Sequence, residues 1–504
     1  MATGVSPESM QKAGPPGDNR LAAGALGLPQ VLFCIVTGAA PIAAMLFNTP
    51  VAVLGSGWAA PATFVIATVA LTIFSVGYVE MAKRVTAAGG FYSFATHAFG
   101  SVVGMGVAFV ITAAYIIFSA SVIGVTAYFA NTTIQDWLSV DVPVFLLLFV
   151  PLIAMAALSF FHVELTAKLL GIFLAIELVA LVVFGFAVLF QGGHDGLSLR
   201  PILPWNAFAD NNTHALGAGI GLFAGFWSWV GFEMAPNYAE EAREPKKVMG
   251  PATYISVIGL GVLYVFITWM LVTGWGMANV QQAVTDQFGG KFASIYYPLT
   301  TEFFGRPLLW AFELTIVTGS FACQFAFFNT ANRYLYSMGR EGVLPRALGR
   351  THPVHKSPYI ASTTVTALVG LYVLGFWLYD GTTLAALTKL GTWGPLLGVS
   401  GILVVQGIVS VGIIKYFATE AKDGQHIWRT IIAPAIGAVS MVVAAYLMLD
   451  NRGDLSGAAN VPFIKYLWLI MPVVFLAGVL LALYYKSADA ERYEGIGRYL
   501  HEDA

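Results

Sequence analysis

The feature that most constrains this chain is a series of long apolar stretches without a charged residue. No Asp, Glu, Lys or Arg occurs anywhere in residues 31–79, for example. A helix needs roughly 20 apolar residues to cross the hydrocarbon core of a bilayer, which is about 30 Å thick. A helix also satisfies its own backbone hydrogen bonds inside that core. The sequence therefore predicts an all-α, polytopic membrane protein.

Counting the stretches predicts twelve transmembrane helices. The first stretch divides at Gly55-Ser56-Gly57 into two helices, because consecutive small and flexible residues favour a turn there. The other expected helices lie in residues 100–135, 142–163, 166–189, 212–232, 248–277, 307–336, 360–379, 384–414, 431–449 and 466–485.

Composition excludes several classes of protein. Charged residues make up 10% of the chain, against roughly 25% in a soluble domain. The net charge of −2 indicates no nucleic-acid partner. The two cysteines, Cys34 and Cys323, give neither a disulfide framework nor a metal-binding spacing. No phosphate-binding Gly-Lys-Ser/Thr loop occurs. We expect no cofactor, no metal and no enzymatic activity, and we expect membrane lipids as surroundings.

The distribution of Lys and Arg predicts the orientation. Most of the 25 basic residues fall in segments that would share one side with both termini, and basic loops favour the cytoplasm. We therefore expect cytoplasmic tails at residues 1–27 and 487–504. The basic residues at 243–247 and from Arg333 to Lys356 are interpreted as anchors of this topology.

Two of the expected helices are interrupted in similar ways. The first contains Val36-Thr37-Gly38-Ala39-Ala40-Pro41, and the sixth contains a Gly-rich run at 224–233 with Pro236 behind it. Proline breaks the helical hydrogen-bond ladder, and irregular backbone survives at membrane depth only where it lines a cavity or is buried in protein. The interruptions lie an odd number of helices apart, so a five-helix repeat would be inverted, as in many transporters. A simple kink at Pro41 is the alternative.

Three motifs, in order, resemble the amino acid–polyamine–organocation transporter superfamily. The first is Ala88-Gly89-Gly90-Phe91-Tyr92 with Phe99-Gly100, at the entry to the third helix. The second is Gly231-Phe232-Glu233 followed by residues 239–247, at the sixth helix. The third is the run at 332–345 after the eighth helix. The resemblance covers about residues 28–485.

The resemblance implies a LeuT-like fold: a five-plus-five inverted repeat with two appended helices. The repeats would be 28–193 and 212–415, and the appended helices 428–486. It implies a secondary transporter that works by alternating access, with a small-molecule substrate between the broken first and sixth helices. The matching substrate-binding positions are Thr37, Gly38, Ala39, Ala40, Pro41, Phe226, Trp227, Ser228, Trp229 and Gly231.

Two further roles come from the same resemblance. Glu233 and Tyr92 match residues that help to form an inner gate in the superfamily's arginine/agmatine antiporter. Trp227 matches a tryptophan that stacks on the substrate there, and an indole face can hold a cation. Trp227 and Trp229 cannot both face the site, because they lie two residues apart on a helix, and we favour Trp227. Packing is the alternative for both indoles.

The first helix departs from the superfamily pattern. Family members commonly carry a Gly-Ser-Gly run there, whereas this chain has Gly38-Ala39-Ala40-Pro41. Pro41 has no amide donor, which weakens the expected recognition of a carboxylate. An amine or polyamine therefore remains an alternative to an amino acid as the substrate.

Glu177 is the candidate for ion or proton coupling. It lies nine residues after Lys168, about 13 Å deeper into the membrane at 1.5 Å per residue. Ionisable groups at that depth are costly and usually functional. A neutral glutamic acid bonded between helices is the alternative. We expect a proton-coupled symporter of amino acids in a bacterial inner membrane, with sodium coupling and ion-free exchange as the next alternatives.

Overall fold

The computed structural model describes residue 24 and residues 26–85, 89–160, 163–209, 216–291 and 293–497, with side chains outside 161–170. Within these ranges the chain forms helices and no strand. One isolated β-bridge pairs Leu26 with Ala242. Most of the expected tail at 1–27 and residues 498–504 of the expected tail at 487–504 fall outside the described residues.

The first half of the chain, up to the second interrupted helix, contains α1 (Leu28–Ala39), α2 (Pro41–Ala43), η2 (Ala44–Asn48), α3 (Thr49–Ser56), η3 (Gly57–Ala59), α4 (Ala60–Arg84), α5 (Gly90–Phe99), α6 (Ser101–Leu138), α7 (Val144–Leu158), α8 (Val163–Gln191), η4 (Arg200–Ile202), η5 (Pro204–Phe208), α9 (Ala218–Trp227) and η6 (Phe232–Tyr238).

The second half contains α10 (Pro245–Trp275), α11 (Val280–Phe288), α12 (Tyr296–Phe303), α13 (Arg306–Arg340), η7 (Arg346–Gly349), α14 (Tyr359–Asp380), α15 (Thr383–Ala385), η8 (Ala386–Leu390), α16 (Gly391–Thr419), η9 (Lys422–Gly424), η10 (Ile427–Ile432), α17 (Ala433–Asp450), α18 (Arg452–Ser456), α19 (Pro462–Ala488) and α20 (Ala490–Gly495).

Nine helical segments of the described chain are long and apolar enough to cross a membrane. The segment Leu28–Arg84 counts as one of them, although a turn at Gly57 divides it (φ 56°). The apolar helix α7 is shorter, and the predicted sixth helix is split into α9 and η6. Short or interrupted helices escape a criterion of length, which explains why fewer than twelve segments qualify. The chain is a multi-pass membrane protein.

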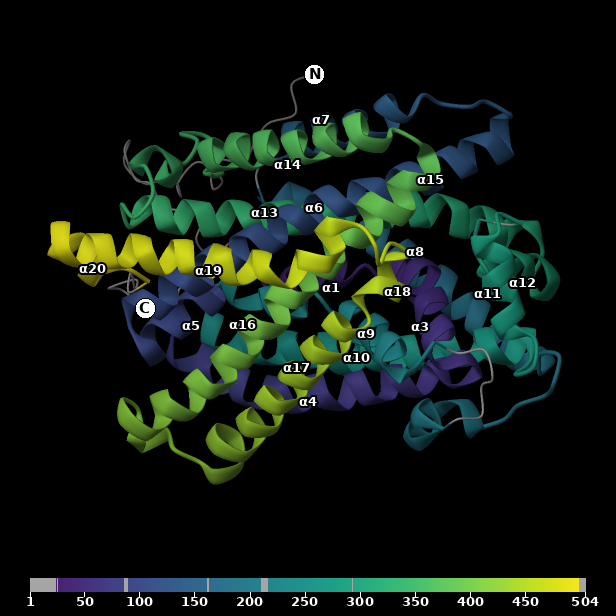
Figure 1. The fold of residues 1–504 in the computed structure, drawn as a ribbon, viewed down its shortest axis with the longest axis horizontal. Helices are drawn as coiled ribbons and strands as arrows, with labels where there is room; N and C mark the ends of the chain where they lie inside the picture. Colours follow the sequence, from purple (N-terminus) through teal and green to yellow (C-terminus); the bar gives the residue numbers. More distant parts are fainter. Residues whose placement is uncertain are drawn as a thin grey trace, which may run out of the picture.

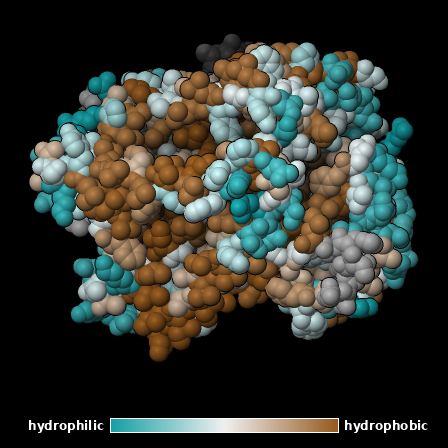
Figure 2. Space-filling model, viewed as in Figure 1, coloured by the Kyte–Doolittle hydropathy of each residue, from teal (hydrophilic) through white to brown (hydrophobic). Residues whose placement is uncertain are grey.

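The helices form one elongated bundle (Figure 1). α6 and α13 pack along each other through its middle, α4 packs on α10, and α16 packs on α17. The C-terminal helix α20 lies at one end of the bundle, whereas α11 and α12 lie at the other. Large apolar side chains are exposed on the outer helices, including Val439 on α17 and Leu480 on α19. Hydrophobic residues accordingly cover much of the surface in Figure 2, as a lipid-facing protein requires.

Candidate functional site

The interruption of the first helix lies at Ala40. This residue adopts a left-handed conformation (φ 43°, ψ 72°), and its amide donates back to Val36 O and Thr37 O. Pro41 then begins a new helical segment, in which the Ala44 amide donates to Ala40 O (2.8 Å). The first amides of a helix have no partner within it, and the helix dipole makes that end positive. Pro41 lacks an amide, so Ile42 and Ala43 supply these amides.

The interruption of the sixth helix lies at residues 228–231, between α9 and η6. Gly231 has φ 120°, which L-amino acids rarely adopt. A Cβ at Gly231 would lie 2.7 Å from the carbonyl carbon of Gly38. The two interruptions therefore touch, backbone against backbone, and the C-terminal end of α9 lies beside Phe47 and Asn48.

Two side chains from other helices bind the backbone of the first interruption. The Tyr264 hydroxyl of α10 donates to Ala39 O (3.1 Å), and the Cys323 thiol of α13 donates to Gly38 O (3.2 Å). The Thr37 hydroxyl is buried and has no hydrogen-bond partner among the described residues. Neither contact was predictable from the sequence, because nothing in the local sequence of Tyr264 or Cys323 points to a helix more than 200 residues away.

The two tryptophans of the sixth helix have different surroundings. Trp229 is fully buried, donates from Nε1 to Val257 O (3.1 Å) and packs edge-on against Tyr264, with ring centroids 4.9 Å apart. Trp227 is half-buried and meets Phe47 edge-on at 5.4 Å. Trp227 therefore stays the candidate to contact a ligand, whereas the Trp229 indole is held by helix packing.

Ser228 and Phe226 complete the predicted set on this helix. The Ser228 hydroxyl donates to Ala224 O (2.7 Å) and accepts from Asn48 Nδ2 (3.0 Å). That bond joins the two interrupted helices a second time, through a residue that sequence analysis did not select. Phe226 is buried, with 6% of its surface exposed. Asn48 lies in a π-helical turn, η2, a distortion common at functional sites.

Glu177 lies beside the first interruption. Its side chain is buried (2% exposed), and Oε2 has no hydrogen-bond partner among the described residues. The carboxyl packs so closely on α13 that a Cβ at Gly319 would lie 2.1 Å from Oε2. That Cβ would also lie 2.7 Å from Ile42 Cγ2. Glu177 and Ile42, at the start of the second half of the broken helix, therefore both lie next to Gly319.

The structure does not bring the two proposed gate residues together. Glu233 is buried, accepts a bond from the Tyr115 hydroxyl (2.8 Å), and accepts another from the Gly231 amide (3.0 Å). Tyr92 instead donates its hydroxyl to Glu341, beyond the end of α13. Glu233 and Tyr92 therefore form hydrogen bonds with different partners.

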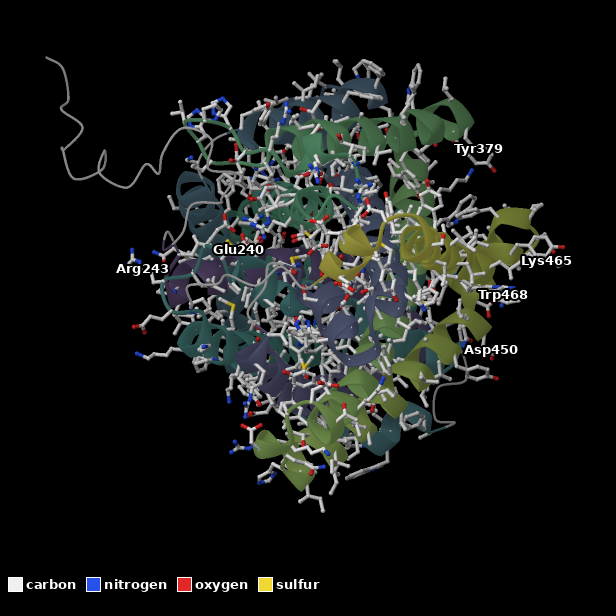
Figure 3. The ribbon with its side chains drawn as sticks, turned by 90° about the vertical axis from the view of Figure 1, so that its left-hand side faces the viewer. Glu240, Arg243, Tyr379, Asp450, Lys465 and Trp468 are labelled. Carbon is white, nitrogen blue, oxygen red and sulfur yellow. The ribbon has the colours of Figure 1, made fainter. Side chains whose placement is uncertain are left out.

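Glu341 belongs to a dense charged cluster that we call the Glu341 end. Glu341 Oε2 also accepts a bond from the Gly497 amide (3.1 Å), and burial raises the pKa of this carboxyl to about 7. Next to it, Arg340 binds Glu240 with both terminal nitrogens. Figure 3 shows Glu240 inside the molecule and Arg243 reaching outward. The segment at 26 pairs with the same loop through Leu26 N and Glu241 O (2.8 Å).

A second ion pair lies deeper in this end. Arg333 donates to Glu241 from Nε (3.0 Å) and Nη2 (2.7 Å) and covers the ring of Tyr238 at 4.3 Å. The side chains of this ion pair are only 6% and 3% exposed. Both Arg333 and Arg340 have guanidinium groups buried against carboxylates, and their interpretation as topology anchors stays a prediction. The local sequence does not indicate that Arg333 pairs with Glu241 or Arg340 with Glu240, because the partners lie on distant segments.

Among the described residues, no group of three or more His, Cys, Asp or Glu side chains is arranged to hold a metal ion. The site around Gly38 and Gly231 offers backbone amides, carbonyls, a hydroxyl, an indole and one carboxyl. These groups can recognise a small polar molecule by hydrogen bonds and charge.

Comparison with known proteins identifies a family and several relatives of the chain. The family described as "Amino acid permease" matches residues 26–488. The branched-chain amino acid permease BcaP of Bacillus subtilis is 21% identical over 442 residues, which cover 82% of this chain and 84% of that protein. The low-affinity putrescine importer PlaP of Escherichia coli is 22% identical over 428 residues, 83% and 85% of the two chains.

A solved structure gives the fold. The manganese transporter of Eremococcus coleocola superimposes with a TM-score of 0.60 at 10% identity, over 93% of this chain and 95% of that one. At this identity the likeness concerns the fold alone. Taken with the match over nearly the whole sequence, it leads to one conclusion: the chain belongs to the amino acid permease family of membrane transport proteins.

Proposed function

We propose that this protein is a secondary transporter that moves amino acids across the cytoplasmic membrane by alternating access. One observation carries the proposal: the two interrupted helices meet at Gly38 and Gly231. The positive end of the segment from Pro41 suits a substrate carboxylate, and the negative end of α9 suits an ammonium group. A zwitterion matches both ends.

The finer architecture belongs to the same proposal. Twelve helices would cross the membrane as two inverted five-helix repeats, 28–193 and 212–415, with 428–486 appended. Both termini would face the cytoplasm of a bacterial cell. The two matched interruptions support this arrangement, because an inverted repeat places its first helices against each other at the centre.

Within the site we assign separate roles to the candidate residues. Residues 37–41 and 226–231 would surround the substrate, with the Trp227 indole as one wall. Glu233 and Tyr92 would close the Glu341 end through different partners, Tyr115 and Glu341. The Glu233–Tyr115 and Tyr92–Glu341 contacts would both have to break before substrate could leave at the Glu341 end.

Glu177 would couple transport to a proton. The carboxyl is buried near the start of the second half of the broken helix, and Oε2 has no partner among the described residues. An uncharged acid in that place becomes easier to ionise when the helix moves away and water enters. Sodium bound at the same carboxylate is the second candidate, and exchange without an ion is the third.

An amine substrate is the alternative, and one observation favours it. Pro41 supplies no amide at the start of the second helical segment. One of the relatives imports putrescine, a diamine without a carboxylate. An amine would use the carbonyl end of α9 and the Trp227 face.

The test is uptake by the purified protein in proteoliposomes. Labelled L-leucine and its decarboxylated amine, isoamylamine, are offered with and without an inward proton gradient. We expect gradient-driven accumulation of L-leucine. Uptake of the amine alone would replace the amino acid by the alternative, and the absence of any uptake would contradict both.

One variant separates coupling from binding. Glu177→Gln should abolish gradient-driven accumulation while exchange of labelled for unlabelled leucine continues, because the amide cannot take up or release the proton. Lys83→Gln, a change at the exposed partner of the ion pair with Glu80, is the control and should leave both activities intact. Undiminished accumulation by Glu177→Gln would refute the coupling role.

A further inference from the structure

The opposite end of α13 carries a cavity of about 570 Å³ lined by Asp136, Trp137, Arg306, Leu309 and Trp310. Asp136 and Trp137 belong to the last turn of α6, and the other three belong to the first turns of α13. We call this region the Arg306 end. α13 has 35 residues, so the Arg306 end lies about 50 Å along the helix from Glu341, at 1.5 Å per residue.

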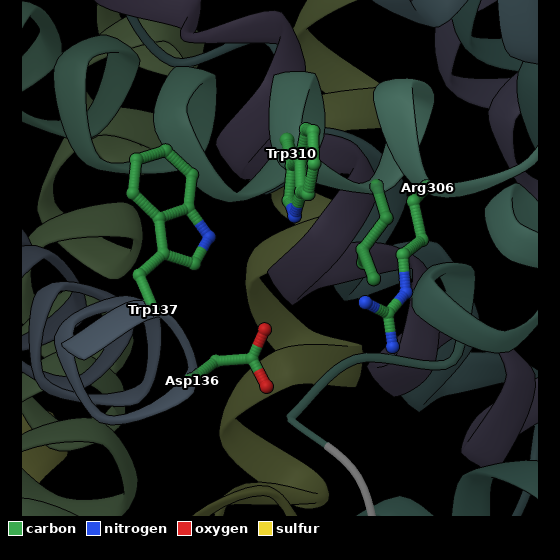
Figure 4. A pocket seen from close by; sticks show the side chains of 5 residues that line it. Asp136, Trp137, Arg306 and Trp310 are labelled. Atoms are coloured by element: carbon green, nitrogen blue, oxygen red, sulfur yellow. The ribbon is translucent and has the colours of Figure 1, made fainter. Parts of the chain in front are cut away.

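Opposite charges face each other across this cavity. Figure 4 shows the Asp136 carboxylate and the Arg306 guanidinium on two sides of the space, both pointing into it. No ion pair joins Asp136 to Arg306, or either of them to another described residue. Two opposite charges that stay apart across a cavity leave room for a molecule that carries the complementary pair.

A second cavity, of about 590 Å³, adjoins the first. Both are lined by Asp136 and Leu309, and the second also by Glu313 and Tyr297. Tyr297 is only 9% exposed, and its hydroxyl has no hydrogen-bond partner among the described residues. An unsatisfied buried hydroxyl is costly, so its presence on a cavity wall points to an occupant.

The neighbouring polar groups already have partners. The Trp137 Nε1 donates to Glu313 Oε2 (2.7 Å), and Glu302 is paired with His194 (2.7 Å). Arg306 and the Tyr297 hydroxyl are therefore left for a ligand, together with Asp136, whose carboxyl also shares a hydrogen bond with Glu313. Two indole rings, of Trp137 and Trp310, are about half exposed beside them (45% and 50%).

We propose that these two cavities form an outer binding site for a free α-amino acid. The ligand's carboxylate binds Arg306, its ammonium group binds Asp136 with the Tyr297 hydroxyl nearby, and its side chain lies along the two indoles. The inference rests on the proposed function, in which amino acids are the substrate class. The proposed topology places this site on the outside of the membrane.

The chemistry selects a zwitterion over other ligands. A simple amine would leave the Arg306 guanidinium without a partner. Asp136, Glu302 and Glu313 all line the second cavity, but among the described residues no group of three or more His, Cys, Asp or Glu side chains is arranged to hold a metal ion. The site is also separate from the central one, because Gly319, which packs on Glu177, lies 13 residues from Arg306 on α13, about 20 Å.

The experiment counts binding sites on the full chain in nanodiscs. Equilibrium binding of labelled L-leucine should show two sites per chain. Asp136→Asn and Arg306→Gln should each weaken one of them at least tenfold, as expected for loss of a charge-assisted bond. Trp227→Ala should weaken the other. Asp454→Asn and Lys465→Gln, two changes elsewhere on exposed segments, are the matched controls and should keep both sites.

Isoamylamine tests the role of the guanidinium. At the outer site of the unchanged protein, L-leucine should bind at least tenfold more tightly than isoamylamine, and Arg306→Gln should remove that preference. A single site that responds to Trp227→Ala alone would overturn the outer site and leave the proposed function standing. The two indoles would then be an interfacial aromatic belt only. Absence of leucine binding together with absence of uptake would overturn the proposed function and this site with it.

Discussion

The two ends of α13 both carry Arg and acidic residues, but the charges are paired at one end and face cavities at the other. At the Glu341 end, Arg333 and Arg340 are buried against Glu241 and Glu240, and the segment at 26 and Gly497 add backbone bonds to the cluster. At the Arg306 end, charges of both signs surround cavities without forming an ion pair with each other.

The difference shows how the helices are held together at each end in this conformation. Buried ion pairs bring distant segments together and exclude water, but their desolvation cost offsets much of their attraction, so a closed end can still open. An end with unpaired charges and cavities is accessible to small molecules. In this conformation buried ion pairs join segments at the Glu341 end, whereas two cavities lie at the Arg306 end.

The largest expected effect on the difference between the two ends comes from removing the buried Arg333–Glu241 ion pair. Arg333→Gln leaves the Glu241 carboxylate buried without its partner, at a cost of about 3–5 kcal/mol. The Glu341 end should then open. Cys34 is a natural reporter, because it is buried and lies near Arg333, Glu241 and Tyr238. In a Cys323→Ser background, we expect maleimide to label Cys34 about 100-fold faster or more.

Two controls accompany this change. Lys247→Gln breaks an exposed pair with Glu244 at the same end and should leave the labelling rate unchanged, because exposed pairs contribute little. Adding Glu241→Gln to Arg333→Gln should slow the labelling again by removing the stranded charge. Slow labelling of the single variant would show that this pair does not hold the end closed.

The C-terminal contact should depend on pH. Burial raises the pKa of Glu341 to about 7, from an ordinary value of 4.5. The folded state therefore favours the protonated acid: the docked contact is most stable below pH 4.5 and loses up to about 3 kcal/mol as pH rises through 7. The groups facing the carboxyl are Tyr92, the Gly497 amide, Arg340 and Glu240.

Hydrogen exchange of the amides in residues 490–497 measures this effect. Exchange, corrected for its intrinsic pH dependence, should be slower at pH 5 than at pH 8. Glu341→Gln should make the protection independent of pH, since an amide does not titrate. Equal protection of the unchanged protein at both pH values would argue against the docking contact.

The contact between the two interrupted helices should tolerate a methyl group on one side only. Gly231→Ala places a Cβ at 2.7 Å from the Gly38 backbone, at a residue with φ 120°, and should cost about 2 kcal/mol or more. Gly38→Ala meets mainly the flexible Met234 side chain, at 3.1 Å, and should cost clearly less. Thermal unfolding in detergent compares the two, and equal melting temperatures would contradict the close approach.

The smallest expected effect is that of Trp227→Ala, a change in the candidate site between the two ends of α13. Trp227→Ala should raise the Kd for the substrate about fivefold, because one indole face is lost. Trp205→Ala, a change at an exposed indole in η5 (66% exposed), is the control. Unchanged substrate binding would assign Trp227 to helix packing against Phe47 and Phe223.

Several features were predictable because their cause is local. Apolar stretches predicted the membrane helices, and the interruptions fall where Pro41 and Gly231 occur, since missing donors and unusual dihedral angles act on neighbouring residues. Helix geometry predicted that Trp227 and Trp229 would not both face the site, and the resemblance to the transporter superfamily favoured Trp227. This choice stays a prediction for substrate binding, although the burial of Trp229 agrees with it.

Long-range pairings were decided by the tertiary structure alone. Tyr92 meets Glu341 rather than Glu233, Arg333 meets Glu241, and Asp136 faces Arg306 across a cavity. No periodicity links residues so far apart in sequence. Sequence determined which segments enter the membrane and where two helices break, because hydrophobicity and backbone sterics are local properties. Which charges are paired, and which are left to face a cavity, depends on how the helices pack.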